Sequence, residues 1–452
     1  MNTTMPVVTR VRKQGNVVSK ELGFVVHYAE RKLGVDWLTD LRHQARKRYL
    51  AIPFPVSTDE AWRRTSLAGL DFASFSLVEA GQSVTGAHVP AALLEPMADE
   101  AHGGEIILTP GGASVQLAES LADLGVVFTD LLTAEREHAH VLEKVMGKIV
   151  KADDGKFAAL AEGFSQTGVL LYVPKGVVVE QPLHSLFWAP GSGLAYISHV
   201  MIYLEEGASV TYVHEAASPT ETSGQSLHVG AVEIHVGPAA SLRLVELQSL
   251  GEHVWNFSHE RVQVERDGKI DWVFGSVGSH LTKNFLDLDL AGRGSEGRMS
   301  GFYFTDDGQH LDHDTQQNHL APNTTSDLLF KGALLGKSRS VWQGMIYVAP
   351  GADKTDGYQA NRNLILNSES RADSIPGLEI KADDVRCSHG ATIGKIDPEQ
   401  VFYLLSRGIP QKEAEQLIVE GFFDPIMQRI PFAGVRARFQ NAIHQKMMSF
   451  SL

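Results

Sequence analysis

Apolar and polar positions alternate through the middle of the chain, from about residue 165 to residue 390. Short runs rich in Val, Ile, Leu, Tyr and Phe follow the two-residue period of a strand, and Gly, Asp, Asn and Ser separate them. Units made of a turn and a strand begin near residues 206, 238, 267 and 296, so they recur about every 30 residues. Because one such unit cannot bury its apolar face alone, the repeat predicts a stacked β-solenoid or a propeller-like fold. No WD or kelch signature is present, which favours a β-helix.

Helical spacing replaces this pattern in the N-terminal part of the chain. Apolar residues recur at helical intervals within residues 21–50, 114–150 and 156–164. Gly125 is expected to end a helix inside the second of these ranges, because glycine readily adopts the left-handed conformation found at helix C-termini. We therefore expect an N-terminal helix-rich domain over residues 1–164.

The last part of the chain is also expected to be helical. Asp397, Pro398 and Glu399 place an acceptor, a proline and an acid where a helix begins. Two further helices are expected up to residue 448, separated by prolines. The predicted organisation is thus a β-helix core over residues 165–396 and a C-terminal helical domain over residues 397–452.

Composition narrows the classes of function. The chain has 452 residues, of which 43% are hydrophobic, and its 40 Lys and Arg against 54 Asp and Glu give a formal net charge of −14. This acidic balance speaks against a nucleic-acid partner, which requires a basic surface. No apolar run reaches the ~18–20 residues of a membrane helix, and the N-terminus lacks the apolar core of a signal peptide. A single cysteine excludes an intramolecular disulfide and fits a reducing compartment, so a cytoplasmic protein without a membrane partner is expected.

The strongest candidate for a functional site lies just before the C-terminal helices, where the single cysteine, Cys387, is followed two residues later by His389. If this segment is a strand, the two side chains point to the same face. A thiolate and an imidazole form half of a soft metal site, because a closed tetrahedral site needs four ligands. The alternative interpretation is structural, since a lone cysteine often behaves as a small buried hydrophobe.

A second candidate is the histidine-rich segment 310–319, in which His310, His313 and His319 accompany Asp312 and Asp314. The spacing fits no zinc motif and no thiolate is near, so a structural polar ladder is the favoured interpretation. The two aspartates also leave open a β-helix enzyme that acts on carbohydrate with paired carboxylates.

Motifs of other enzymes are missing. Residues 334–340 contain a GKS triplet, but lysine stands where a Walker A motif requires its first glycine. The chain also contains no GxSxG or HExxH motif. It is therefore not expected to hydrolyse ATP or to be an enzyme.

Four long segments carry a resemblance to a known family: residues 168–183 (GVLLYVPKGVVVEQPL), 319–334 (HLAPNTTSDLLFKGAL), 348–366 (VAPGADKTDGYQANRNLIL) and 382–423. They are similar to the SufB/SufD family of iron–sulfur cluster assembly proteins, and weaker similarity extends to residues 60–67. The resemblance implies a right-handed parallel β-helix between N-terminal and C-terminal helical domains. It also implies a scaffold rather than an enzyme. The SufB branch usually carries several cysteines, so the single cysteine favours the other branch.

The resemblance further implies partners and site residues. It predicts pairing with a SufB-like paralogue, with a homodimer possible in isolation, and docking of a SufC-like ABC ATPase on the C-terminal helices. His389 matches a histidine that lies at the SufB contact, where a nascent iron–sulfur cluster is expected to form. Cys387, on the same face, is the less favoured candidate ligand. Such a cluster would be shared transiently, with none bound stably by this chain alone. A purely structural partner of SufB is the remaining alternative. The residues expected to contact the ATPase are Arg407, Gly408, Ile409, Ala414, Leu417, Ile418, Gly421 and Phe422.

Overall fold

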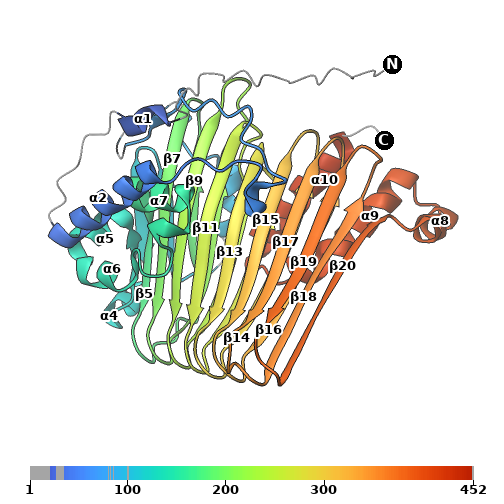
Figure 1. The fold of residues 1–452 in the computed structure, drawn as a ribbon. Coiled ribbons are helices and arrows are strands. Elements are labelled where there is room, and N and C mark those ends of the chain that lie inside the picture. The colour runs from blue at the N-terminus through green and yellow to red at the C-terminus, as the bar shows by residue number, and fades with distance from the viewer. Residues whose placement is uncertain are drawn as a thin grey trace, which may run out of the picture.

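A parallel β-solenoid forms the body of the molecule, with helices at both of its ends (Figure 1). In the part of the chain that the structure describes, the strands form two sheets of ten strands each. The chain alternates between the two sheets, one strand at a time, through all successive coils. The computed structural model describes residues 21–26, 35–79, 81, 83, 84, 86–98 and 101–449.

The first sheet, sheet A, holds the odd-numbered solenoid strands. These are β5 (Thr167–Val173), β7 (Leu194–Leu204), β9 (Ser226–Val236), β11 (Val254–Val264), β13 (Leu281–Leu290), β15 (His310–His319), β17 (Arg339–Val348) and β19 (Arg371–Ile380). Sheet B holds the even-numbered ones. These are β6 (Leu183–Trp188), β8 (Ser209–Ala217), β10 (Ser241–Ser249), β12 (Lys269–Ser276), β14 (Glu296–Thr305), β16 (Thr325–Leu334), β18 (Thr355–Ile365) and β20 (Val385–Lys395).

The repeat seen in the sequence corresponds to the coils of sheet B. Ser241 pairs with Ser209 on one side and with Lys269 on the other, and Lys269 pairs with Glu296. Each unit of about 30 residues is therefore one complete coil, and the predicted parallel β-helix is confirmed.

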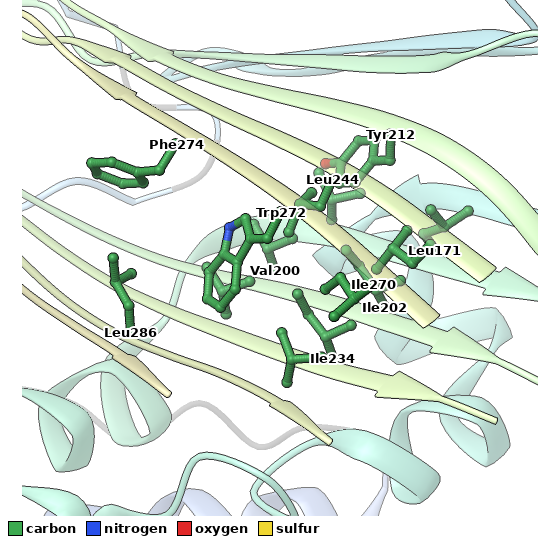
Figure 2. Packing of buried hydrophobic residues seen from close by; sticks show 14 of the residues in the cluster. Leu171, Val200, Ile202, Tyr212, Ile234, Leu244, Ile270, Trp272, Phe274 and Leu286 are labelled. Atoms are coloured by element: carbon green, nitrogen blue, oxygen red, sulfur yellow. The ribbon is translucent and has the colours of Figure 1, made fainter. Parts of the chain in front are cut away.

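The core of the solenoid lies in its lumen, between the two sheets. Tyr212, Leu244, Trp272, Met299 and Leu328 occupy one register column of sheet B, and all are buried. Figure 2 shows part of this column facing aliphatic side chains from sheet A. Burying one such large side chain contributes roughly 1.5–3 kcal/mol, so the column is a main source of stability.

The N-terminal segment contributes helices to one face of sheet A and strands to both sheets. Phe157 stacks on Phe257 with ring centroids 4.0 Å apart, which packs α7 onto β11. Strands β2 and β4 pair with β6 and β5, so both sheets continue beyond the predicted boundary at residue 164. The helices are α1 (Gly23–Val26), α2 (Asp36–Ala51), η1 (Glu60–Trp62), α3 (Ala91–Ala98), α4 (Glu119–Asp123), α5 (Leu131–Glu137), α6 (Ala139–Val145), η2 (Ala152–Asp154) and α7 (Lys156–Phe164). The strands are β1 (Ser76–Leu77), β2 (Gly104–Thr109), β3 (Gly112–Leu117) and β4 (Val127–Asp130).

Two expectations for this segment need correction. Residues 114–117 belong to strand β3 rather than to a helix, because β3 pairs antiparallel with β2 after a glycine turn. The helix expected through residue 150 is broken at His138, whose backbone leaves the helical region (φ −126°, ψ 28°). Gly125 does follow a helix end with a positive φ of 82°, as predicted. In the expected first helix, His27 and Leu33 lie outside the described residues.

Three C-terminal helices follow β20, and two of them cover the outer face of sheet B. They are α8 (Pro398–Ser406), α9 (Gln411–Met427) and α10 (Ala433–Ser449). The ring of Phe302 meets those of Phe423 and Phe439 edge to face, at 6.1 and 6.0 Å. Arg438 and Lys446 of α10 pair with Glu215 and Asp306 of the solenoid. None of the helices in the described chain is long and apolar enough to span a membrane.

A buried carboxylate joins the N-terminal segment to the solenoid. Glu233 of β9 is fully buried and accepts a hydrogen bond from His199 Nε2 at 2.7 Å. It also accepts from four consecutive backbone N–H groups at 2.7–3.1 Å. These amides belong to residues 147–150, which follow α6. A carboxylate with this many donors is firmly held, so the loop after α6 is fixed by one side chain.

We expect Glu233→Gln to loosen this loop, because an amide offers one acceptor oxygen and points an NH₂ group at backbone donors. Amide hydrogen exchange followed by mass spectrometry is the measurement. Residues 147–150 should exchange roughly tenfold faster or more in the variant, the equivalent of ~1.4 kcal/mol of lost protection. Glu252→Gln, at an exposed position, is the control and should leave exchange unchanged. Equal protection in wild type and Glu233→Gln would contradict this role.

Candidate functional site

The candidate residues lie on β20, the last strand of sheet B. Cys387 pairs in register with Gly357, and His389 with Gln359. The column that contains Gln359 continues through Leu328 and Met299, which face the lumen. Cys387 and His389 therefore share one face, as predicted, and that face is the lumen side of the last coil.

The last coil is open to solvent. Gln359, one coil earlier, is completely buried, whereas His389 in the same column is exposed. The neighbouring lumen positions of this coil carry Leu378, Ile380 and Ile393, which are 37–49% exposed. Within the described chain, β19 and β20 each pair with a strand on one side only. Apolar side chains and unpaired strand edges in one place are typical of a surface that another chain covers.

Cys387 is more recessed than His389. It packs beside Ile346 and Val348, and its side chain is about half buried. Burial raises the pKa of the Cys387 thiol, the backbone of Gly357 lowers it in part, and the charge of Asp356 raises it further. The thiol rather than the thiolate is thus the main form at neutral pH.

Gly357 leaves the space beneath this thiol. A Cβ on Gly357 would lie 3.3 Å from Cys387 Sγ and 3.2 Å from Nε2 of the buried His319. His319 is held by Thr324 and Ser326, at 2.7 and 2.8 Å. The described residues contain no group of three or more His, Cys, Asp or Glu side chains placed to hold a metal. Cys387 and His389 are therefore an incomplete ligand set.

Several side chains of the histidine-rich segment contact other parts of this chain. Asp312 is fully buried and forms a 3.0 Å ion pair with Lys283, which is also fully buried. Thr65 of the N-terminal segment bonds to His310 Nε2 at 2.8 Å and also donates to Asp312. These contacts attach the N-terminal segment to the outer face of sheet A. With Asp312 buried, the aspartate pair of a carbohydrate-active enzyme is not available.

The helices after β20 present the residues expected to contact an ATPase. Arg407, Gly408, Leu417 and Gly421 are exposed. Three others, Ile409, Ile418 and Phe422, are partly exposed. The prediction that Ala414 contacts the ATPase is wrong, because its side chain is fully buried and no partner can reach it.

Three exposed apolar side chains of α8 were not among the residues expected to contact a partner. Phe402, Tyr403 and Leu405 of α8 are 71%, 57% and 41% exposed. The amphipathic pattern of α8 by itself favours an apolar face that packs on the chain itself. Instead α8 has no buried residue, and a groove of about 400 Å³ separates it from the solenoid end and α10. An apolar stripe on a short helix does not reveal whether its partner is internal or external.

Comparison with known proteins now identifies the class. The family model described as "SUF system FeS cluster assembly, SufBD core domain" matches residues 187–422. The model "SufBD protein N-terminal region" matches residues 113–184. The chain belongs to the SufBD family of iron–sulfur cluster assembly proteins.

Two curated relatives place the chain more closely within that family. It is 30% identical over 447 residues to the iron-sulfur cluster assembly protein SufD of Bacillus subtilis, covering 96% of this chain and 99% of the relative. It is 33% identical over 318 residues to an iron-sulfur cluster assembly SufBD family protein of Staphylococcus haemolyticus, covering 70% and 68% of the two chains. The similarity to SufD thus extends over nearly the full length of both chains.

The raised pKa of Cys387 predicts slow alkylation of this thiol. In the isolated chain, iodoacetamide should modify Cys387 more slowly at pH 7–8 than the same thiol in urea, since the folded chain holds less thiolate. Removal of a nearby negative charge by Asp356→Asn should lower the pKa and speed the reaction, whereas Asp383→Asn, at an exposed position beside the site, serves as the control. Mass spectrometry of the alkylated peptide against time and pH is the measurement. Faster modification in the folded chain would contradict the assignment.

Proposed function

We propose that this chain is a SufD-type scaffold subunit that pairs with a SufB-like paralogue through the open end of its solenoid. The observation that carries the proposal is the last coil, where lumen positions and strand edges are exposed. A second β-solenoid with a similar open end would cover both at once and continue the apolar lumen. The same surface could pair two copies of this chain when no paralogue is present.

His389 is the residue that would face a nascent cluster in this pairing. It lies at the mouth of the lumen, where an imidazole nitrogen can reach iron held mainly by the partner. Cys387 is the weaker ligand, because its thiol is recessed and its pKa is raised. In this proposal the cluster is the product that the complex assembles, and the two partners bind it transiently. This chain offers only two potential ligands, which are too few to bind a cluster stably by itself.

The SufC-like ATPase would dock on α8 and the adjoining part of α9. Support comes from the exposed Phe402, Tyr403 and Leu405 of α8 and from the exposed Leu417 of α9, a helix that α8 contacts. Anchored helices α9 and α10 would carry movement of the ATPase to the solenoid. In this scheme the chain is a cytoplasmic scaffold and not itself an enzyme. The alternative function is that of a purely structural partner of SufB, which supplies no ligand to the cluster.

Replacement of His389 separates the ligand from the purely structural role. The chain is produced anaerobically with the SufB-like and SufC-like proteins of its own genome, and iron and sulfide are counted in the purified complex. His389→Ala should lower both severalfold while the complex still assembles, because the side chain is exposed and its loss costs the fold little. Ser388→Ala is the matched control, since Ser388 points to the opposite face of the same strand.

Two outcomes would count against this scheme. Unchanged iron and sulfide in the His389→Ala complex would leave only the structural role. Failure of the unmodified chain to bind the SufB-like protein at all would overturn the pairing itself.

A second experiment tests the ATPase surface. Phe402→Asp places a charge in the exposed apolar face of α8 and should weaken binding of the SufC-like protein at least tenfold in a titration by calorimetry. Val56→Asp makes the same change at a distant side chain of 55% exposure and should leave affinity unchanged. If both variants bind as tightly as wild type, the ATPase docks elsewhere.

A further inference from the structure

A small chamber lies inside the solenoid, well away from the open end. It has a volume of about 50 Å³, and both sheets contribute to its wall. Unlike the apolar core beside it, the chamber has several polar side chains in its wall, among apolar ones. Six of the polar side chains are His214, His228, Glu246, Asn256, Glu260 and Asn284.

Two carboxyl groups face each other across this chamber. Glu246 comes from β10 of sheet B and Glu260 from β11 of sheet A, both are buried, and they lie within hydrogen-bond reach of each other. Trp272 Nε1 donates to Glu246 Oε2 at 2.6 Å, and Ser258 Oγ donates to Glu260 Oε1 at 2.5 Å. The second oxygen of Glu260 has no donor among the described residues.

Among the residues that the structure describes, no lysine or arginine lines the chamber to balance these carboxyl groups. His214 of β8 and His228 of β9 line the chamber, and Tyr212 of β8 lies close enough to Glu246 for the charge of that carboxyl group to raise its pKa. Burial lowers the pKa of His214 to about 3 and that of His228 to about 4, so both imidazoles are neutral at pH 7. Burial raises the pKa of Tyr212, which stays a neutral phenol. Two ionised carboxylates would thus be buried side by side without compensation, which is strongly unfavourable.

We propose that Glu246 and Glu260 together bind one proton at neutral pH, so that the chamber is a proton-binding site in the middle of the solenoid. The O–H of one carboxyl group donates to an oxygen of the other, which gives the unpaired oxygen of Glu260 a partner. Carboxyl groups that share a site in this way lose their protons as a pair rather than as two independent acids.

The site links the stability of the solenoid to pH. Burial raises the pKa of Glu246 from 4.5 to about 7, and burial together with the charge of Glu246 raises the pKa of Glu260 well above 4.5. Since both pKa values are higher in the folded chain, the stabilisation is complete below about pH 4.5 and is lost as the pH rises through 7. Unfolding above pH 4.5 therefore releases the bound proton.

Two measurements on the full chain test the site. The first is the infrared carbonyl stretch of protonated carboxyl groups at pH 7, compared between wild type, Glu246→Gln and Glu260→Gln; part of the band should disappear in each variant. The second is urea unfolding between pH 5 and 8.5. The unfolding equilibrium constant of wild type should rise roughly 10- to 100-fold more than that of Glu246→Gln over this range. Glu252→Gln, at an exposed glutamate, should behave like wild type in both.

The same band in wild type and both Gln variants, with equal dependence of unfolding on pH, would overturn the proposal. If the Gln variants do not fold, Trp272→Phe provides the test. It keeps an aromatic ring in the core and removes the N–H that bonds to Glu246. The carboxyl band should then shift in frequency, and an unshifted band would overturn the proposal equally.

Discussion

In-register stacking of parallel strands is the constraint on which the rest of this structure depends. Each lumen side chain must fit between equivalent side chains of the coils before and after it, because pairs such as Leu244 and Trp272 are fixed by backbone hydrogen bonds. A single strand shifted by one residue would turn its apolar set outward. The columns that result carry apolar side chains, the carboxyl pair and, at the last coil, His389. Their contents change along the axis while the backbone geometry stays the same.

Features that depend on local periodicity were predictable from the sequence. The two-residue period placed Cys387 and His389 on one face, and the repeat of about 30 residues gave the solenoid. The Glu246–Glu260 pair was less predictable. Its one local sign is that Glu246 lies on the same strand face as the buried Leu242 and Leu244. Which side chain Glu246 meets inside the lumen depends on the path of the whole chain.

Features that depend on packing between distant segments were not predictable. The exposure of Phe402 and the burial of Ala414 depend on how the three C-terminal helices pack on one another and on the solenoid, which no short sequence pattern specifies. Residues 114–117 are part of a strand because they pair with β2, and this tertiary context overrides their helical pattern. The carboxylate of Glu233 meets backbone N–H groups more than 80 residues earlier in the chain, at a loop that its own sequence does not mark as a partner.

The pairing of Arg438 with Glu215 has a consequence for synthesis of the chain. Glu215 is buried and lies 223 residues before its partner, close to His184 in the first coils. Arg438 also donates to the backbone of Leu93, so α10 spans from the last coils back to the first. A ribosome releases the early coils long before it makes this arginine. The carboxylate of Glu215 in the first coils consequently lacks this positively charged partner until translation has passed Arg438.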